Sequence, residues 1–87
     1  MILHLVRHPK PVIAPGICYG RLDISAENVV AVATRLRDDL PPSLPVWSSP
    51  LRRCHELATL LHPTPLIDDR LAEMNFGDWE GRPWDSI

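Results

Sequence analysis

Residues 44–53, which read Leu-Pro-Val-Trp-Ser-Ser-Pro-Leu-Arg-Arg, decide the fold of this chain. The first part, residues 44–48, is typical of a short buried strand. Ser49 and Pro50 follow directly, and this pair predicts a helix with a serine cap and a proline at its first position. Apolar residues then recur at helical spacing to about Leu61. The stretch is therefore predicted to pass from a strand directly into a helix.

The flanking sequence continues the same alternation on both sides. Residues 2–6 form an apolar run that fits a buried strand. Ser25 is placed to cap a helix whose apolar positions run to Leu40, where two prolines stop it. Residues 66–67 are a weak third strand, and residues 68–81 are predicted to be irregular. The order strand, helix, strand, helix, strand predicts an α/β fold with a parallel sheet, in which ligands lie beyond the carboxyl ends of the strands.

Length and composition limit the classes of protein that fit. A chain of 87 residues with 45% hydrophobic residues is at most one domain with a small core. The net charge of -2 argues against a general nucleic-acid binder, and no apolar run is long enough for a signal peptide or a membrane span. Cys18 and Cys54 are isolated thiols, which favours the reducing cytoplasm, although a disulfide between them is a minor alternative.

Arg7-His8 is the first pair of residues with chemical potential. It falls where the strand at residues 2–6 is predicted to end. A guanidinium beside an imidazole can hold phosphate oxygens while the imidazole attacks phosphorus. The dipeptide alone is also compatible with a surface arginine and a structural histidine.

Arg52 and Arg53 are the second candidate, because they stand at the positive end of a predicted helix, where acidic residues are usual. An anionic ligand would explain them. At about 100° per residue, Arg52 lies opposite the apolar face and Arg53 on its flank. The geometry therefore favours Arg53 for a site and Arg52 for solvent, with two solvated arginines as the alternative.

The third candidate is residues 71–81, where Glu73 and other carboxylates lie among apolar and aromatic residues. Desolvation in such a setting raises the pKa of a carboxyl group, as a general acid requires. The alternative is that Phe76 and Trp79 anchor an ordered loop while the carboxylates stay in water.

The remaining histidines form no metal set. His4 alternates with apolar residues and is predicted to be packed or at a sheet edge, and His55 and His62 lie seven residues apart on or after one helix. No further ligands complete a coordination sphere, so we expect no metal.

Four motifs follow one another along the chain: Leu5-Val6-Arg7-His8, Cys18-Tyr19-Gly20-Arg21-Leu22-Asp23, Ser48-Ser49-Pro50-Leu51-Arg52-Arg53-Cys54, and Leu71 to Gly81. Together and in this order they resemble the histidine phosphatase superfamily, whose members include phosphoglycerate mutases. The closest likeness is to α-ribazole phosphatases of cobalamin synthesis, judged from Cys-Tyr-Gly and Phe-Gly-Asp-Trp-Glu-Gly.

The resemblance implies a fold and a set of roles. The fold is the N-terminal part of a three-layer, parallel-sheet α/β domain. His8 matches the nucleophile and Glu73 the acid that protonates the leaving group. The residues that match substrate contacts are Arg7, Arg53, Tyr19 and Gly20. A small phosphorylated substrate is implied, with no metal or other cofactor, while the net charge and the short apolar runs predict no nucleic-acid or membrane partner.

This chain departs from the family pattern at two points. Pro9 stands where Gly or Thr is usual and cannot donate a backbone N–H, and the second histidine of a later strand has no match. We therefore expect residues 1–87 to be a single, incomplete domain with feeble or no activity by itself, and its exposed sheet edge to favour a homodimer.

The function expected of the parent enzyme is a phosphomonoesterase for a small metabolite such as α-ribazole 5'-phosphate, acting through a phosphohistidine on His8. Two alternatives stay open. One is mutase-like phosphoryl transfer, and the other is a phosphate-binding or interaction module without turnover.

Overall fold

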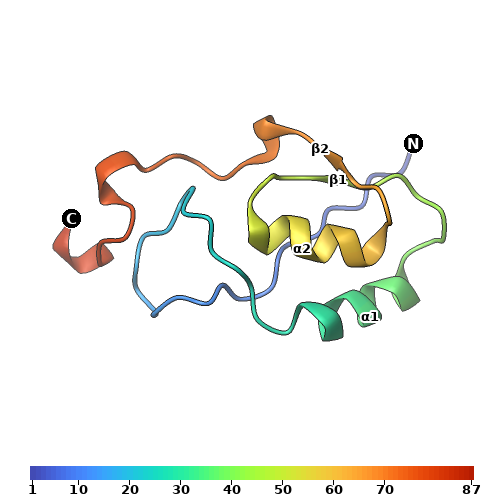
Figure 1. Cartoon of the computed structure of the whole chain (residues 1–87), viewed down its shortest axis with the longest axis horizontal. Coiled ribbons are helices and arrows are strands. Elements are labelled where there is room, and N and C mark those ends of the chain that lie inside the picture. Colours follow the sequence, from blue (N-terminus) through green and yellow to red (C-terminus); the bar gives the residue numbers. More distant parts are fainter.

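Two helices and two short strands form the regular part of the computed structural model, which describes residues 1–87. Helix α1 spans Val29–Asp39, strand β1 Trp47–Ser48, helix α2 Arg52–Leu61 and strand β2 Leu66–Ile67. Helix α2 contacts both β1 and α1, and it lies between them in Figure 1. Neither helix has the length and apolar character needed to cross a bilayer.

The two strands pair in parallel, with Trp47 beside Leu66 and Ser48 beside Ile67. Helix α2 connects them, because a parallel pair needs a crossover rather than a tight turn. The predicted α/β class and the parallel arrangement are confirmed. Ser48 and Ser49 are buried at the carboxyl end of β1, where the chain turns toward α2.

Both helices begin later than the sequence predicts. Ser25 does not cap α1, since its hydroxyl donates to Glu56 Oε1 at 3.2 Å, and the helix begins after Asn28, which has a φ of 55°. Helix α2 begins at Arg52 and not at Pro50. The backbone N–H of Arg52 donates to Asp23 Oδ1 at 2.6 Å, so a carboxylate from a distant loop supplies the capping acceptor.

The predicted strand at residues 2–6 is wrong. No backbone hydrogen bond joins residues 1–9 to another segment. The apolar side chains of this segment are largely exposed, with Ile2 at 83%, Leu3 at 76% and Leu5 at 87%. A strand requires a neighbouring strand to hydrogen-bond with. The apolar run at residues 2–6 has no such neighbour in this structure.

The core is small and lies where α1 and α2 meet. Its buried apolar residues include Ala33 on α1 and Leu57 and Ala58 on α2. The radius of gyration is 14.1 Å and the longest extent is 44 Å, whereas a compact domain of this length would have a radius of about 12 Å. Much of the chain therefore lies outside a packed core.

The loop around Cys18 is joined to the C-terminal segment by an antiparallel contact. The Gly81 N–H donates to Cys18 O at 2.7 Å, the Cys18 N–H to Arg82 O at 2.9 Å and the Trp84 N–H to Gly16 O at 2.8 Å. Figure 1 shows these two segments side by side at the end away from α1.

The C-terminal part is irregular, as predicted, and contains three single 3₁₀ turns. The last, Trp84–Ser86, is a short turn where the sequence suggests that an α-helix opens. These turns carry the segment past Tyr19 and Gly20.

Candidate active site

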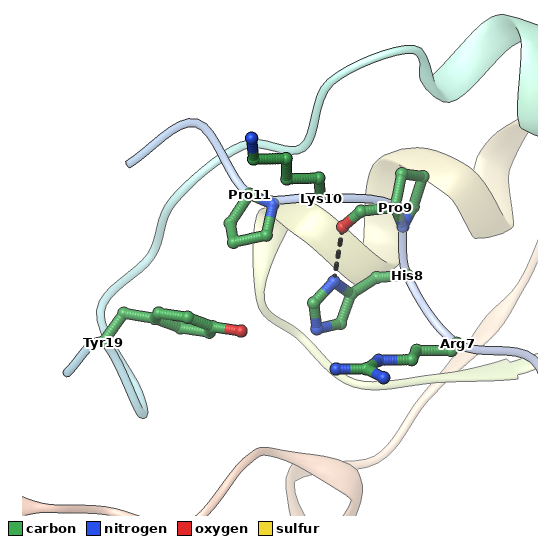
Figure 2. A pocket seen from close by; sticks show the side chains of 6 residues that line it. All are labelled: Arg7, His8, Pro9, Lys10, Pro11 and Tyr19. Carbon is green, nitrogen blue, oxygen red and sulfur yellow. Dashed lines mark hydrogen bonds between the residues drawn. The ribbon is translucent and has the colours of Figure 1, made fainter. Parts of the chain in front are cut away.

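Arg7 and His8 line a surface hollow of about 290 Å³, called here the first hollow. Figure 2 shows the Tyr19 hydroxyl pointing toward the His8 ring from the left and the Arg7 guanidinium lying below that ring. The residues that line the first hollow are Arg7, His8, Pro9, Lys10, Pro11 and Tyr19. A cation, an imidazole and a phenol therefore meet there, although residues 2–6 before them are not in a sheet.

The His8 ring is held by the residue that follows it. His8 Nδ1 lies 2.7 Å from Pro9 O. A carbonyl oxygen can only accept, so Nδ1 must carry the proton, and in the neutral ring the lone pair is then on Nε2. In Figure 2 Nε2 lies on the side of Arg7 and Tyr19. Pro9 has no N–H to offer a ligand, but its carbonyl fixes the tautomer that a nucleophile needs.

A second hollow, of about 230 Å³, shares Tyr19 with the first. Its residues are Tyr19, Gly20, Glu73, Phe76 and Trp84. Glu73 is exposed, and its Oε1 accepts from the Met74 N–H at 3.0 Å. Phe76 packs edge-on against Trp84 with ring centres 5.3 Å apart, whereas Trp79 is 47% exposed. Trp84, and not Trp79, is the aromatic partner of this loop.

Gly20 sits where the loop and the C-terminal segment come closest. Its φ is 40°, and a Cβ built on it would lie 2.6 Å from the Phe76 ring and 2.8 Å from Met74 O, with the Glu80 carboxylate also in contact. Only glycine fits both this conformation and this spacing. Gly20 therefore brings the residues that line the second hollow against Tyr19.

Arg53 contacts Tyr19 and Gly20 but lines neither hollow. It is 1% exposed, and its guanidinium lies 4.9 Å from the centre of the Tyr19 ring. Its two terminal nitrogens donate to the carbonyls of Gly20 and Leu22, the second at 2.7 Å, while Nε is buried without a partner. Arg52 is exposed and pairs with Glu56 at 3.2 Å. The arginine that helix geometry directs inward is thus buried, and the other faces solvent.

Glu80 and Arg21 lie in two of the motifs, but sequence reasoning missed the contact between them. Glu80 Oε2 accepts from the Arg21 N–H at 2.9 Å and from the Phe76 N–H at 3.0 Å. The first of these bonds is the main reason that the pKa of Glu80 lies below its usual value, so the expected rise by desolvation is wrong for this carboxylate. Arg21 Nε also donates to Glu73 O at 2.9 Å. No local spacing shows that residues 21 and 80 meet.

The two cysteines are both free thiols, so the disulfide alternative is not realised. Burial raises the pKa of Cys18, with the Glu80 charge adding to the effect, and burial likewise raises the pKa of Cys54. His4, His55 and His62 line neither hollow. No group of three or more His, Cys, Asp or Glu side chains is arranged to hold a metal ion.

Comparison with known proteins identifies the family. The sequence profile of the histidine phosphatase superfamily, branch 1, matches residues 3–87. The chain belongs to this superfamily. Among curated relatives, a Hydrogenobacter thermophilus protein named "Putative phosphoserine phosphatase 2" is 36% identical over 88 residues, which cover 92% of this chain and 43% of that protein.

Solved structures of related proteins have the same fold. A mycobacterial glucosyl-3-phosphoglycerate phosphatase superposes with a TM-score of 0.79 at 28% identity, over 92% of this chain and 42% of that one. The Thermus thermophilus protein TTHB049 gives a TM-score of 0.78 at 33% identity, over 93% of this chain and 48% of that one. The chain thus spans less than half the length of these relatives.

A structure of the mycobacterial phosphatase with VO3 also matches this chain, and that alignment gives 30% identity and a TM-score of 0.75. The superfamily expected from the four motifs is confirmed, and its phosphatase relatives agree with phosphatase chemistry in general.

Proposed function

We propose that this chain is the N-terminal part of a phosphomonoesterase that works through a phosphohistidine on His8. The observation that carries the proposal is the hydrogen bond from His8 Nδ1 to Pro9 O, 2.7 Å long. In the neutral ring it places the lone pair on Nε2, which lies on the side of Arg7 and Tyr19. A neutral, oriented imidazole beside a cation is the arrangement that nucleophilic attack on a phosphoryl group requires.

In the first step the lone pair of His8 Nε2 forms a bond to phosphorus as the bond from phosphorus to the ester oxygen breaks. Glu73, protonated at its second carboxyl oxygen, gives its proton to the departing alkoxide. Arg7 donates to the phosphoryl oxygens as charge spreads over them. Arg53 lines neither hollow, and we propose that it instead holds Tyr19 in place through the contact of its guanidinium with the Tyr19 ring.

In the second step water attacks phosphorus and the bond between Nε2 and phosphorus breaks. Glu73, now ionised, takes a proton from the attacking water, which restores both the acid and the neutral histidine. Inorganic phosphate then leaves. The carbonyls of Gly20 and Leu22 hold the Arg53 guanidinium in place throughout.

The substrate we propose is a small phosphorylated metabolite. The names of the relatives point to phosphoserine and glucosyl-3-phosphoglycerate, and the Cys-Tyr-Gly motif adds α-ribazole 5'-phosphate through its likeness to α-ribazole phosphatases. All three are phosphomonoesters. We further propose a cytoplasmic setting, which is supported by two free thiols.

A phosphate-binding module without turnover is the second candidate, because His8 is the only histidine that lines either hollow. Such a module would bind inorganic phosphate but release none from an ester.

The test is to assay phosphate release from an aryl phosphate and the three metabolites, using the 87-residue chain and the longest natural polypeptide that contains it. His8→Ala is expected to lose at least roughly a thousandfold in activity. The matched control is His4→Ala, which changes an exposed histidine of the same segment and should retain activity. Phosphate binding without release from any ester would favour the second candidate.

A further inference from the structure

We infer that the second hollow is a binding site for the leaving group and that it selects phosphomonoesters whose alcohol carries a planar ring. The inference rests on the proposed function, in which Glu73 of the second hollow protonates the group that leaves when His8 of the first hollow attacks phosphorus. Glu73 lines the second hollow but not the first, and Tyr19 lines both. If Glu73 protonates the departing oxygen, that oxygen lies within reach of Glu73, and the second hollow is the space that can take the rest of the leaving group.

The walls of the second hollow are aromatic. Tyr19, Phe76 and Trp84 line it, and Phe76 and Trp84 are fixed relative to each other by an edge-on contact at an interplanar angle of 89°. The Arg53 guanidinium contacts the Tyr19 ring, 4.9 Å from its centre, and so holds Tyr19. Three rings that are held in place offer stacking and edge contacts to a planar group at little cost in side-chain entropy.

The size and charge of the second hollow agree with a neutral ring. Its volume of about 230 Å³ exceeds the roughly 150 Å³ that accommodates benzene in an apolar cavity. No lysine or arginine lines it, and its only charged side chain is Glu73. A leaving group with a carboxylate of its own would find no cation there to pair with.

Trp84 is the residue that we assign to ring selectivity. Trp84 lines the second hollow and not the first, and the residue as a whole is 45% exposed, so it is accessible to a ligand there. Trp79 is 47% exposed, belongs to the same C-terminal segment and lines neither hollow. The two tryptophans are therefore a matched pair for substitution.

The test compares two phosphonates that cannot be hydrolysed, benzylphosphonate and propylphosphonate, with inorganic phosphate as the reference. Their dissociation constants are measured by calorimetric titration of the 87-residue chain and of the longest natural polypeptide that contains it. The wild-type protein is expected to bind benzylphosphonate roughly 3- to 10-fold more tightly than propylphosphonate. Trp84→Leu should remove most of this preference, Trp84→Phe should keep most of it, and Trp79→Leu should leave it unchanged.

Equal affinity for the two phosphonates in the wild-type protein, with inorganic phosphate still bound, would overturn the inference and leave the proposed function intact. Equal loss of preference in Trp79→Leu and Trp84→Leu would also overturn it, because a general effect on folding would then account for both. Failure to bind any phosphonate or inorganic phosphate would refute the proposed function, and the inference with it.

Discussion

Two residues, Gly20 and Glu80, hold the loop that contains Tyr19 against the C-terminal segment. Gly20 lets two segments approach within contact distance, and the Glu80 carboxylate joins them by accepting from Arg21 and Phe76. Neither residue acts on a substrate in the proposed mechanism. Both determine where Tyr19 and Glu73 lie, and both can be tested by matched substitutions.

Gly20→Ala is predicted to destabilise the protein by about 2–4 kcal/mol, because the new methyl group meets Phe76 and Met74 O in a left-handed backbone conformation. Gly16→Ala is the control. Gly16 also has a positive φ, 79°, but nothing lies within 4 Å of its Cβ position, so about 1 kcal/mol is expected. Urea denaturation measures both, and equal losses would show that Gly20 is not a close contact.

Glu80→Gln is predicted to flatten the acid side of the stability curve. The pKa of Glu80 is lowered in the folded protein from the usual 4.5, chiefly by the Arg21 N–H. Its contribution is therefore complete above pH 4.5 and is lost as pH falls through the lower, folded value. The pKa of Asp68 is also lowered, chiefly by its hydrogen bond with the Arg70 side chain. Only the difference between wild type and variant therefore isolates the contribution of Glu80.

The measurement for Glu80 is urea denaturation at several pH values between neutrality and the acid range. Asp78→Asn is the control, since Asp78 is exposed. An unchanged pH slope in Glu80→Gln would contradict the hydrogen bonds seen for Glu80 Oε2.

At the residue scale, motifs and helical periodicity identify the residues around Tyr19, but their contacts come only from the structure. Helix geometry distinguishes Arg53 from Arg52 because a turn of about 100° per residue is a local rule. The bonds of Arg53 to the carbonyls of Gly20 and Leu22 join positions more than thirty residues apart. No local pattern encodes such a pairing.

At the scale of elements, the two helices and the β1–β2 pair follow from the sequence, while residues 2–6 do not. The apolar faces of α1 and α2 cover each other, so their local pattern and their tertiary partner are both present in the chain. The apolar run at residues 2–6 has the composition of a strand but no backbone partner. Pairing, and not composition, decides whether a strand forms.

Hydrogen exchange tests this difference between elements. Backbone amides of residues 2–6 are predicted to exchange at the rate of an unfolded peptide, because they donate no backbone hydrogen bond. Amides in the second half of α2 should be protected, since they donate within the helix and lie beside buried Leu57 and Ala58. NMR or mass spectrometry measures both.

Protection of residues 2–6 would contradict this expectation and would indicate a partner strand. Protection that rises with protein concentration would identify the partner as a second copy of the chain, as the homodimer proposal requires.

At the scale of the whole molecule, the core is too small to cover the whole chain. Only 8 of 87 residues are buried, and the radius of gyration exceeds that of a compact domain. The relatives are more than twice as long as the part of them that this chain matches. We propose that residues 1–87 are an incomplete domain whose activity depends on further sequence.

The central claim is that His8 carries the phosphoryl group, and trapping the intermediate tests it most directly. The longest natural polypeptide that contains the chain is mixed with an aryl phosphate, quenched in alkali and digested for mass spectrometry. We predict one acid-labile phosphoryl group on the peptide with His8, absent in His8→Ala and present in His4→Ala. Turnover with no phosphoryl group on His8, or with an acid-stable phosphoryl group on another residue, would contradict the claim.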